Sequence, residues 1–265
     1  MKNIAWWSAG ATSAVATKLA LEMYDNVEVV YIGIRTAHSD NDRFMRDCEK
    51  WYGVKIKTVS SEKYNDQFEV VKKKRFINSP YGAACSKALK AEVREKIQAG
   101  YTHHIFGFEY DKHEINRAIR FKQQHPKTNP LYPLIERKIS GEEAHGILVG
   151  AGIDLPEMYK LGYQNNNCVG CVKGGKGYWN KIRLDFPEVF DKMAKLEREI
   201  GATCIKELDE NEESRRVYLD ELDPKAGNLK PIVPSCGLFC QSEFEWLMDN
   251  KVAKVMNGEL DIKDV

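Results

Sequence analysis

The first sixty residues alternate between short apolar segments and helical segments, and this alternation most limits the possible folds. Residues 3–7, 27–32 and 54–59 are apolar runs too short for helices, and they read as strands. Between them, residues 13–23 and 40–52 show helical composition or spacing. Strands that alternate with helices form right-handed crossover units around a parallel sheet. We therefore predict an α/β fold with a parallel sheet flanked by helices.

The rest of the 265-residue chain is less regular. We predict a strand at 103–107, a linker at 129–134 and further helices at 87–99, 141–150, 155–161, 186–200 and 243–256. We place an α/β domain at 1–135 and a mainly helical, cysteine-bearing capping region at 136–265. No signal-peptide pattern or run of about 18 apolar residues appears, so we expect a cytoplasmic protein with no membrane partner.

A loop of small residues, 8–13, joins the first strand to the first helix. Its small side chains let backbone N–H groups approach an anion, and the helix N-terminus favours negative charge there. The hydroxyls of Ser8, Thr12 and Ser13 are further donors. An ordinary turn, with Thr12 or Ser13 capping the helix, explains the same residues. The loop matches neither a Walker A motif nor the dinucleotide fingerprint.

This loop resembles the pyrophosphate-binding loop of the PP-loop superfamily, Ser-Gly-Gly-x-Asp-Ser, and within it the phosphoadenosine phosphosulfate (PAPS) reductase family. Ser8, Gly10 and Ser13 match that pattern. Ala9 replaces a glycine, and Thr12 replaces the aspartate, which bears on any use of Mg(II) with a triphosphate. The resemblance implies an adenine nucleotide alpha-hydrolase-like fold that binds an adenine nucleotide, either ATP or a sulfonucleotide (PAPS or APS).

Three later stretches extend the resemblance. Gly33-Ile34-Arg35 ends a strand where the family places residues near adenosine, and residues 85–90 are similar to its Cys-x-x-x-Lys segment. Gly107 and Glu109, followed by Glu114 and Arg117, are similar to its Gly-x-Arg-x-x-Glu-Ser-x-x-Arg segment, with Glu109 where an Arg is often found. The resemblance implies cations that contact phosphate or sulfate, for which the candidates are Arg35, Lys87, Lys90 and Arg117. We assign catalytic roles to Lys90 and Arg117. The alternative for each is a solvated surface charge.

Four of the seven cysteines form two close pairs. Cys168 and Cys171 form a Cys-x-x-Cys, and Cys236 and Cys240 form a Cys-x-x-x-Cys. Each spacing suits two thiolates on one metal, so the four predict a Zn(II) site or a [4Fe–4S] cluster. Members of the family that carry clusters favour iron–sulfur. The alternative is two unrelated pairs of thiols.

A second interpretation uses the same residues differently. The segment at Cys236 resembles the family's C-terminal Glu-Cys-Gly-Leu-His, whose Cys is a nucleophile towards sulfur, but it lacks the Glu and the His. Cys236 would then be catalytic, with Cys85, Cys168 and Cys171 as metal ligands. Cys48 and Cys204 read as packing thiols. The glycine- and lysine-rich residues 171–183 read as a phosphate-contacting loop or as a turn into the next helix.

Three functional hypotheses follow. The leading one is ATP-dependent adenylation or sulfur transfer to a nucleic-acid or small-molecule acceptor, with a sulfur or thiol donor protein as a partner. The second is reduction of a sulfonucleotide, with a Cys236 thiolate attacking sulfur. The third is a catalytically degenerate module that binds nucleotide and metal. A net charge of +1 gives no overall field that would distinguish between them.

Overall fold

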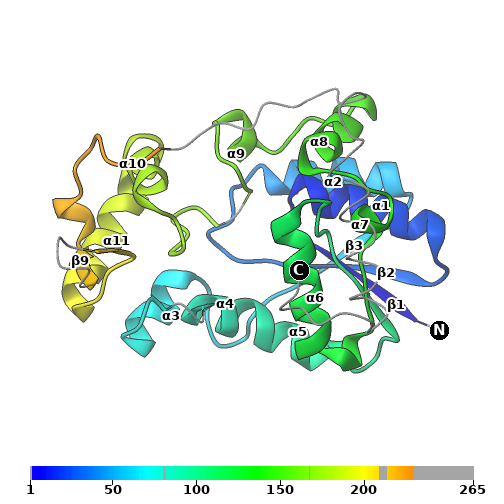
Figure 1. The fold of residues 1–265 in the computed structure, drawn as a ribbon, viewed down its shortest axis with the longest axis horizontal. Coiled ribbons are helices and arrows are strands. Elements are labelled where there is room, and N and C mark those ends of the chain that lie inside the picture. Colours follow the sequence, from blue (N-terminus) through cyan, green and yellow to red (C-terminus); the bar gives the residue numbers. More distant parts are fainter. Residues whose placement is uncertain (1, 80–81, 167, 209–213, 229–265) are drawn as a thin grey trace.

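A computed structural model describes residues 2–79, 82–166, 168–208 and 214–228. Its centre is a five-stranded parallel sheet in the order β3-β2-β1-β6-β7, seen edge-on at the right of Figure 1. The strands are β1 (Asn3–Trp7), β2 (Val27–Ile32), β3 (Ile56–Val59), β6 (His103–Ile105) and β7 (Pro130–Leu131). The predicted α/β fold with a parallel sheet and flanking helices is confirmed.

The strand order reverses direction at β1. The chain adds β2 and β3 on one side of β1, then returns to place β6 and β7 on the other side. Ala5 pairs with Val29 of β2 and with Ile105 of β6, so β1 is central and almost fully buried. In open α/β sheets, ligands bind at the carboxyl ends of the strands where such a reversal occurs. Here that position lies just after β1 and β6.

Helices pack against this sheet through small and aromatic side chains. Helix α1 (Ala11–Met23) is rich in buried alanine and packs against α2 (Asn41–Tyr52), α7 (Pro133–Glu136) and α8 (Gly141–Gly150). In α2 the buried Phe44, Cys48 and Tyr52 recur every four residues, and Gly53 ends the helix with φ 71°. A left-handed glycine at this position is a common helix stop.

The helix predicted at 87–99 contains an irregular turn. Short helix α4 (Ala84–Ser86) leads into a π-helical turn, η1 (Lys87–Ala91), and then into α5 (Glu92–Gln98). The wider turn adds a residue to the helical repeat and therefore changes which side chains share a face. Turns of this kind occur often at functional sites.

The prediction was wrong for residues 129–134 and missed several helices. Pro130 and Leu131 form the fifth strand, which tolerates proline because β7 lies at the sheet edge. Helix α6 (Lys112–Gln124) begins at Asp111, whose side chain accepts N–H groups from His113 and Glu114. Helix α10 (Lys176–Asp185) begins within the glycine-rich segment, directly after Gly175.

A second hydrophobic core lies to the left in Figure 1. It joins α10 and α11 (Pro187–Ile200) to the antiparallel strands β8 (Ile205–Leu208) and β9 (Ser214–Val217). Trp179 and Met193 are fully buried in it. The remaining elements are α3 (Gln67–Lys74), β4 (Asn78–Ser79), β5 (Gly82–Ala83), η2 (Pro126–Thr128), α9 (Glu157–Lys160) and η3 (Leu219–Glu221).

The buried carboxylate of Glu197 holds this core together. It accepts backbone N–H groups from Cys204 at 2.6 Å and from Leu219 at 2.7 Å. The predicted helix at 243–256 lies outside the described residues, and the domain boundary at 135 stays a prediction. No helix in the described part of the chain is both long and apolar enough to cross a membrane.

Candidate functional site

The loop between β1 and α1 is held together by its own hydroxyls. Ser13 Oγ accepts the Ser8 backbone N–H at 3.0 Å and donates to the Gly10 carbonyl at 2.8 Å, while the Ser8 hydroxyl donates to Ser13 Oγ. Ser13 thus shapes the loop. Gly10 is the N-cap of α1, so the capping alternative for Thr12 or Ser13 is wrong. The Tyr159 hydroxyl accepts the Ala11 N–H at 3.3 Å, which leaves the N–H groups of Thr12 and Ser13 as first-turn donors for an anion.

Ala9 occupies a backbone conformation that normally belongs to glycine. Its φ is 62°, at the position where the resembling loop carries glycine, and its side chain is fully buried. The buried side chain of Asn166 fixes this turn, since its Nδ2 donates to the Ala9 carbonyl at 2.6 Å and to Asn41 Oδ1 at 2.7 Å. Asn166 was not predicted, although a run of amide residues before Cys168 marks its place in the sequence.

Gly107 brings the end of β6 against the same loop. A Cβ at Gly107 would lie 2.5 Å from Ser13 Cα and 2.7 Å from Ser13 N. No side chain fits into this gap, so the role of Gly107 is a close contact between two backbone segments.

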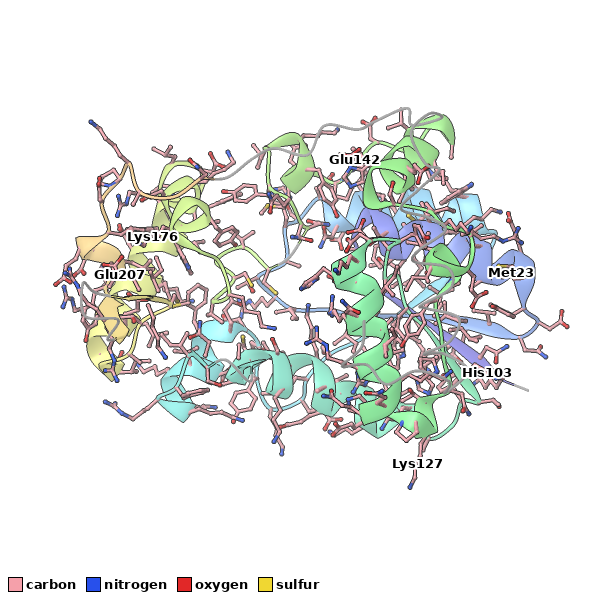
Figure 2. The ribbon with its side chains drawn as sticks, in the orientation of Figure 1. Met23, His103, Lys127, Glu142, Lys176 and Glu207 are labelled. Atoms are coloured by element: carbon pink, nitrogen blue, oxygen red, sulfur yellow. The ribbon has the colours of Figure 1, made fainter. Side chains whose placement is uncertain are left out.

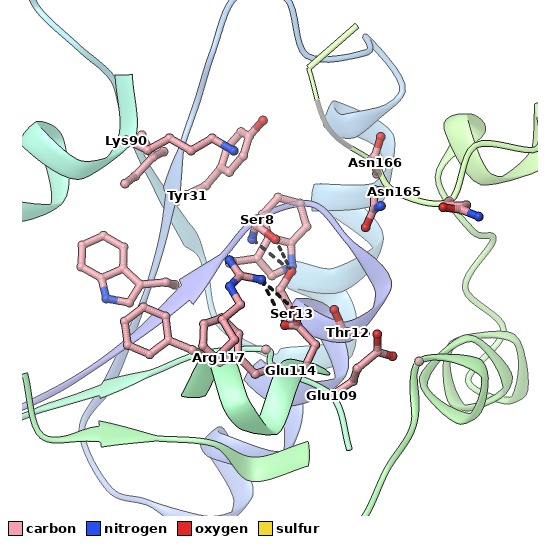
Figure 3. Close-up of a pocket in the computed structure, with 18 of the residues that line it drawn as sticks. Ser8, Thr12, Ser13, Tyr31, Lys90, Glu109, Glu114, Arg117, Asn165 and Asn166 are labelled. Atoms are coloured by element: carbon pink, nitrogen blue, oxygen red, sulfur yellow. Dashed lines mark hydrogen bonds and ion pairs between the residues drawn. The ribbon is translucent and has the colours of Figure 1, made fainter. Parts of the chain in front are cut away.

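These elements enclose a cavity of about 940 Å³ at the reversal of strand order (Figure 3). Of the predicted nucleotide-site and catalytic residues, the cavity is lined by Ser8, Thr12, Ser13, Lys90, Gly107, Glu109 and Arg117. Cys168 lines it too. Parallel-sheet topology therefore brings together residues that are up to 160 positions apart in the sequence.

Gly10, Gly33, Arg35 and Lys87 do not line this cavity among the described residues. Gly33 bonds to the Val59 carbonyl, and the cavity wall beside it is formed by Ile32 and Ile34 instead. Arg35 and Lys87 are exposed. Lys87 lies three residues before Lys90 in η1, and only Lys90 of the two reaches the cavity.

Charged groups on the wall after β6 interact closely. Arg117 binds both Glu114 carboxylate oxygens at 3.1 Å and lies over the Phe108 ring at 4.5 Å. Burial, with Asp111 and Glu114 nearby, raises the pKa of Glu109 to about 7. Glu109 is therefore partly protonated near neutral pH, which moderates the repulsion between it and a bound phosphate.

Arg94 of α5 also lines the cavity, and the sequence did not single it out. Its guanidinium lies over the Phe121 ring at 5.3 Å, and its buried Nε has no hydrogen-bond partner among the described residues. Phe121 lies on α6, 27 residues away, so only the fold shows that this arginine is not an ordinary surface charge.

The turn at Cys168–Cys171 is rigidly anchored. Gly170 has φ 75°, and a Cβ there would lie 2.6 Å from the Val189 side chain. The Tyr178 hydroxyl accepts the Cys171 N–H at 2.9 Å and donates to the Cys168 carbonyl at 3.2 Å. Cys171 lines a second cavity of about 580 Å³, shared with the glycines before α10.

The environments of the other described cysteines differ. Cys48 and Cys204 are buried and Cys48 packs in the sheet core, as predicted, and burial raises the pKa of the Cys48 thiol to about 12. Cys85 interacts electrostatically with Cys168 and Cys171, and burial raises its pKa to about 11. In the described ranges, no three His, Cys, Asp or Glu side chains are placed to hold a metal ion together. Cys236 and Cys240 lie outside those ranges.

The fold and the cavity define an α/β protein with a ligand-sized cavity at the carboxyl ends of β1 and β6. The phosphoadenosine phosphosulfate reductase domain matches residues 2–176, and the chain belongs to that family.

Two curated relatives are uncharacterized proteins of Methanocaldococcus jannaschii. MJ0973 is 22% identical over 236 residues, which is 86% of this chain and 54% of the relative. MJ0066 is 26% identical over 207 residues, or 73% of this chain and 41% of the relative. The chain thus spans about half the length of these relatives or less.

Solved structures with some similarity include a phosphoadenylyl-sulfate reductase from Candida auris in complex with phosphate. It has a TM-score of 0.45 at 12% identity, covering 62% of this chain and 79% of the other. A U34-tRNA thiolase, NcsA from Methanococcus maripaludis with its [4Fe-4S] cluster, has a TM-score of 0.42 at 16% identity, covering 76% and 72%.

Proposed function

We propose that this protein binds an adenine nucleotide with its phosphates on the loop at residues 8–13 and transfers the adenylyl group of ATP to an acceptor. One observation carries this proposal: the N-terminus of α1, with a glycine N-cap, opens into a large cavity that also holds Lys90 and Arg117. Backbone donors and cations around one space suit a polyphosphate with a charged leaving group.

In the proposed step, an acceptor oxygen forms a bond to the α-phosphorus of ATP while the bond from that phosphorus to the bridging oxygen breaks. Pyrophosphate leaves with the electron pair, and the first-turn N–H groups of α1 stabilise its charge. Lys90 is exposed to the cavity and makes no ion pair with a carboxylate of the described chain, so its charge is available for phosphate. Glu109, whose pKa is about 7, is suited to accept the acceptor's proton.

The residues present do not form a dedicated Mg²⁺ site. Thr12 stands where the resembling loop has aspartate, and no acidic cluster of the described residues is arranged as a metal cage. No step in this proposal therefore depends on a metal held by the protein.

For a zinc ion or iron–sulfur cluster, the described residues supply half of the proposed ligand set. Tyr178 anchors the backbone of the turn at Cys168–Cys171, and the sequence spacing of these two cysteines suits two thiolates on one metal. We propose Cys236 and Cys240 as the other two ligands. A cluster there would supply redox chemistry and a route for sulfur beside the nucleotide cavity, whereas zinc would be structural. Anaerobic purification followed by metal analysis tests this proposal: about four Fe or one Zn per chain supports it, and neither metal refutes it.

ATP–pyrophosphate exchange tests the adenylation proposal, and the chain offers a matched pair of variants. Lys90→Ala removes a cation that lines the cavity, whereas Lys74→Ala removes an exposed cation of α3 that does not. We expect Lys90→Ala to lower exchange about a hundredfold and Lys74→Ala to change it less than threefold. Equal effects, or no exchange with any acceptor despite ATP binding, would contradict the proposal. Absence of exchange despite ATP binding would support the degenerate module, which the replacement of aspartate by Thr12 favours.

Sulfonucleotide reduction by Cys236 is the second candidate, supported by the family and by the Cys168 thiol in the nucleotide cavity. Its assay is thiol-dependent release of sulfite from PAPS or APS, which Cys236→Ser should abolish. The family match ends at residue 176, so it does not extend to Cys236. No sulfite from either sulfonucleotide would exclude this activity.

A further inference from the structure

Two arginines lie on one aromatic cluster at the wall of the nucleotide cavity. Phe108 is stacked on Tyr132, with ring centroids 5.4 Å apart and planes 14° apart, and Arg117 covers it at 4.5 Å. Phe106 lies edge-on to Phe121 at 4.7 Å, and Arg94 lies over that second ring. Guanidinium planes supported in this way are good surfaces for stacking a nucleobase, and they also bind phosphate.

The cavity extends from the loop at residues 8–13 to residues of η1, α5 and α6. Its volume of about 940 Å³ is near the upper end of the roughly 300–1,000 Å³ typical of one small-molecule site. Trp6, Phe106 and Phe108 line it together with Lys90, Arg94 and Arg117. Lys90 lies well away from Thr12 and Asn166, which are beside the phosphate loop in Figure 3. The aromatic and cationic wall is thus an addition to the loop that takes the nucleotide phosphates.

Positive charge continues outward from this wall along both helical segments. Arg120 is exposed one turn beyond Arg117 on α6, and Lys87 is exposed one turn before Lys90 on η1. Helix α6 has one carboxylate, Glu114, which Arg117 already binds, against four cations: Lys112, Arg117, Arg120 and Lys122. Lys90 and Arg94 make no ion pair with a carboxylate of the described residues. A mononucleotide would use only the wall, whereas a strand could also follow the exposed cations.

We propose that this wall binds single-stranded nucleic acid, with an unpaired base against Arg94 and Arg117 and its backbone phosphates along the exposed cations. This inference rests on the proposed function, because the strand would be the acceptor for the adenylyl group. The chemistry is shared by RNA and DNA, since every base offers a stacking face and every phosphate a charge.

Fluorescence anisotropy with the full chain tests the proposal, using fluorescein-labelled ten-nucleotide single strands of RNA and of DNA. We expect binding to at least one of them and at least tenfold weaker binding to the matching duplex. We also expect a salt dependence of about two released counterions for three phosphate-contacting cations, Lys87, Lys90 and Arg120. Arg94→Ala should weaken strand binding about tenfold, and Arg94→Lys should restore only part of it, because lysine lacks the planar group. Arg46→Ala on α2 removes an exposed arginine that does not line the cavity, and it should have no effect.

ATP binding, measured by calorimetry on the same variants, distinguishes the two proposals. Retained ATP binding with no strand binding, or with duplex bound as tightly as single strand, overturns this inference alone. Loss of ATP binding in Arg94→Ala also overturns it, because the arginine would then belong to the nucleotide site. If the wild-type chain binds neither ligand, the proposed function fails as well. Circular dichroism checks folding. The exposed Arg120→Gln, which lies outside the nucleotide cavity, replaces Arg94→Ala if that variant is unfolded, with weaker strand binding and unchanged ATP binding expected.

Discussion

Gly107→Ala is the sharpest test of how the phosphate loop is held. The new methyl carbon would lie 2.5 Å from Ser13 Cα and 2.7 Å from Ser13 N, whereas carbon atoms in contact normally lie about 3.5–4.0 Å apart. The two backbone segments would therefore have to separate by about 1 Å. Neither can rotate away as a flexible side chain would, because both clashing atoms belong to the backbone of the first turn of α1.

We expect this separation to affect both stability and binding. Overpacking of a tight core contact costs about 1–3 kcal/mol, so Gly107→Ala should lower the free energy of unfolding by that amount. ATP affinity should fall at least tenfold, because the first-turn N–H groups would no longer converge on one phosphate. Urea denaturation and calorimetric titration with ATP measure the two effects separately.

Gly150→Ala is the matched control. Gly150 ends α8, and a Cβ there would have no neighbour within 4 Å. It should change stability by less than about 1 kcal/mol, in the favourable direction if at all, and leave ATP binding unchanged. The reasoning is refuted if Gly107→Ala is as stable as this control and binds ATP as well as the wild type does.

Three further predictions concern other contacts of the site. Asn166→Ala should cost about 1–3 kcal/mol and weaken ATP binding, because the Ala9 carbonyl and Asn41 lose their buried partner. The exposed Gln123→Ala, which does not line the cavity, should do neither, as urea denaturation and ATP titration would show. The pKa of Glu109 is about 7 in the native state, against 4.5 for an ordinary glutamate, so the native state binds this proton more tightly than the unfolded state does. The free energy of unfolding should therefore fall as the pH rises from about 4.5 to about 7. Glu109→Gln should flatten that part of the stability profile, measured by urea denaturation at pH 5 and pH 8, and an unchanged slope would show that the carboxyl is not responsible. Tyr178→Phe should free the Cys168–Cys171 turn, lower stability by about 1 kcal/mol and lower the metal content of the anaerobically purified protein. Tyr163→Phe loses a hydrogen bond to Asp185 and should also lower stability by about 1 kcal/mol, but it should leave the metal content unchanged.

Local patterns were sufficient to predict the start of the fold. Strands β1 and β2 have the predicted bounds, and α2 begins one residue after its predicted start, because apolar runs and the glycine stop at Gly53 act within a few residues. Strand β7 was missed because Pro130 indicates a linker when its neighbours are unknown. Only the finished sheet shows that this residue lies at an edge, where its missing N–H costs nothing.

The candidate site was predictable where it depends on one loop and less so where it depends on packing. Ser8, Thr12 and Ser13 follow a strand directly, so their place at its carboxyl end follows from the topology. Arg94 resembles any other helical surface charge until Phe121 is placed beneath it. The wider π turn at Lys87–Ala91 gives no sequence signal that we recognise, yet Lys90 reaches the cavity from this turn and Lys87 does not.

Asn166 and Cys168 are separated by a single residue, and this short spacing has a thermodynamic consequence. The first holds the backbone turn of the loop at residues 8–13, and the second lines the cavity where we propose that the nucleotide binds. A group that binds or oxidises the thiol and thereby moves this segment also moves the clamp on Ala9. If a ligand of the thiol changes nucleotide affinity by some factor, nucleotide binding must change the affinity for that ligand by the same factor, because coupling between two ligands at equilibrium is reciprocal. The redox or metal state of the cysteine turn and the occupancy of the phosphate loop would then report on each other.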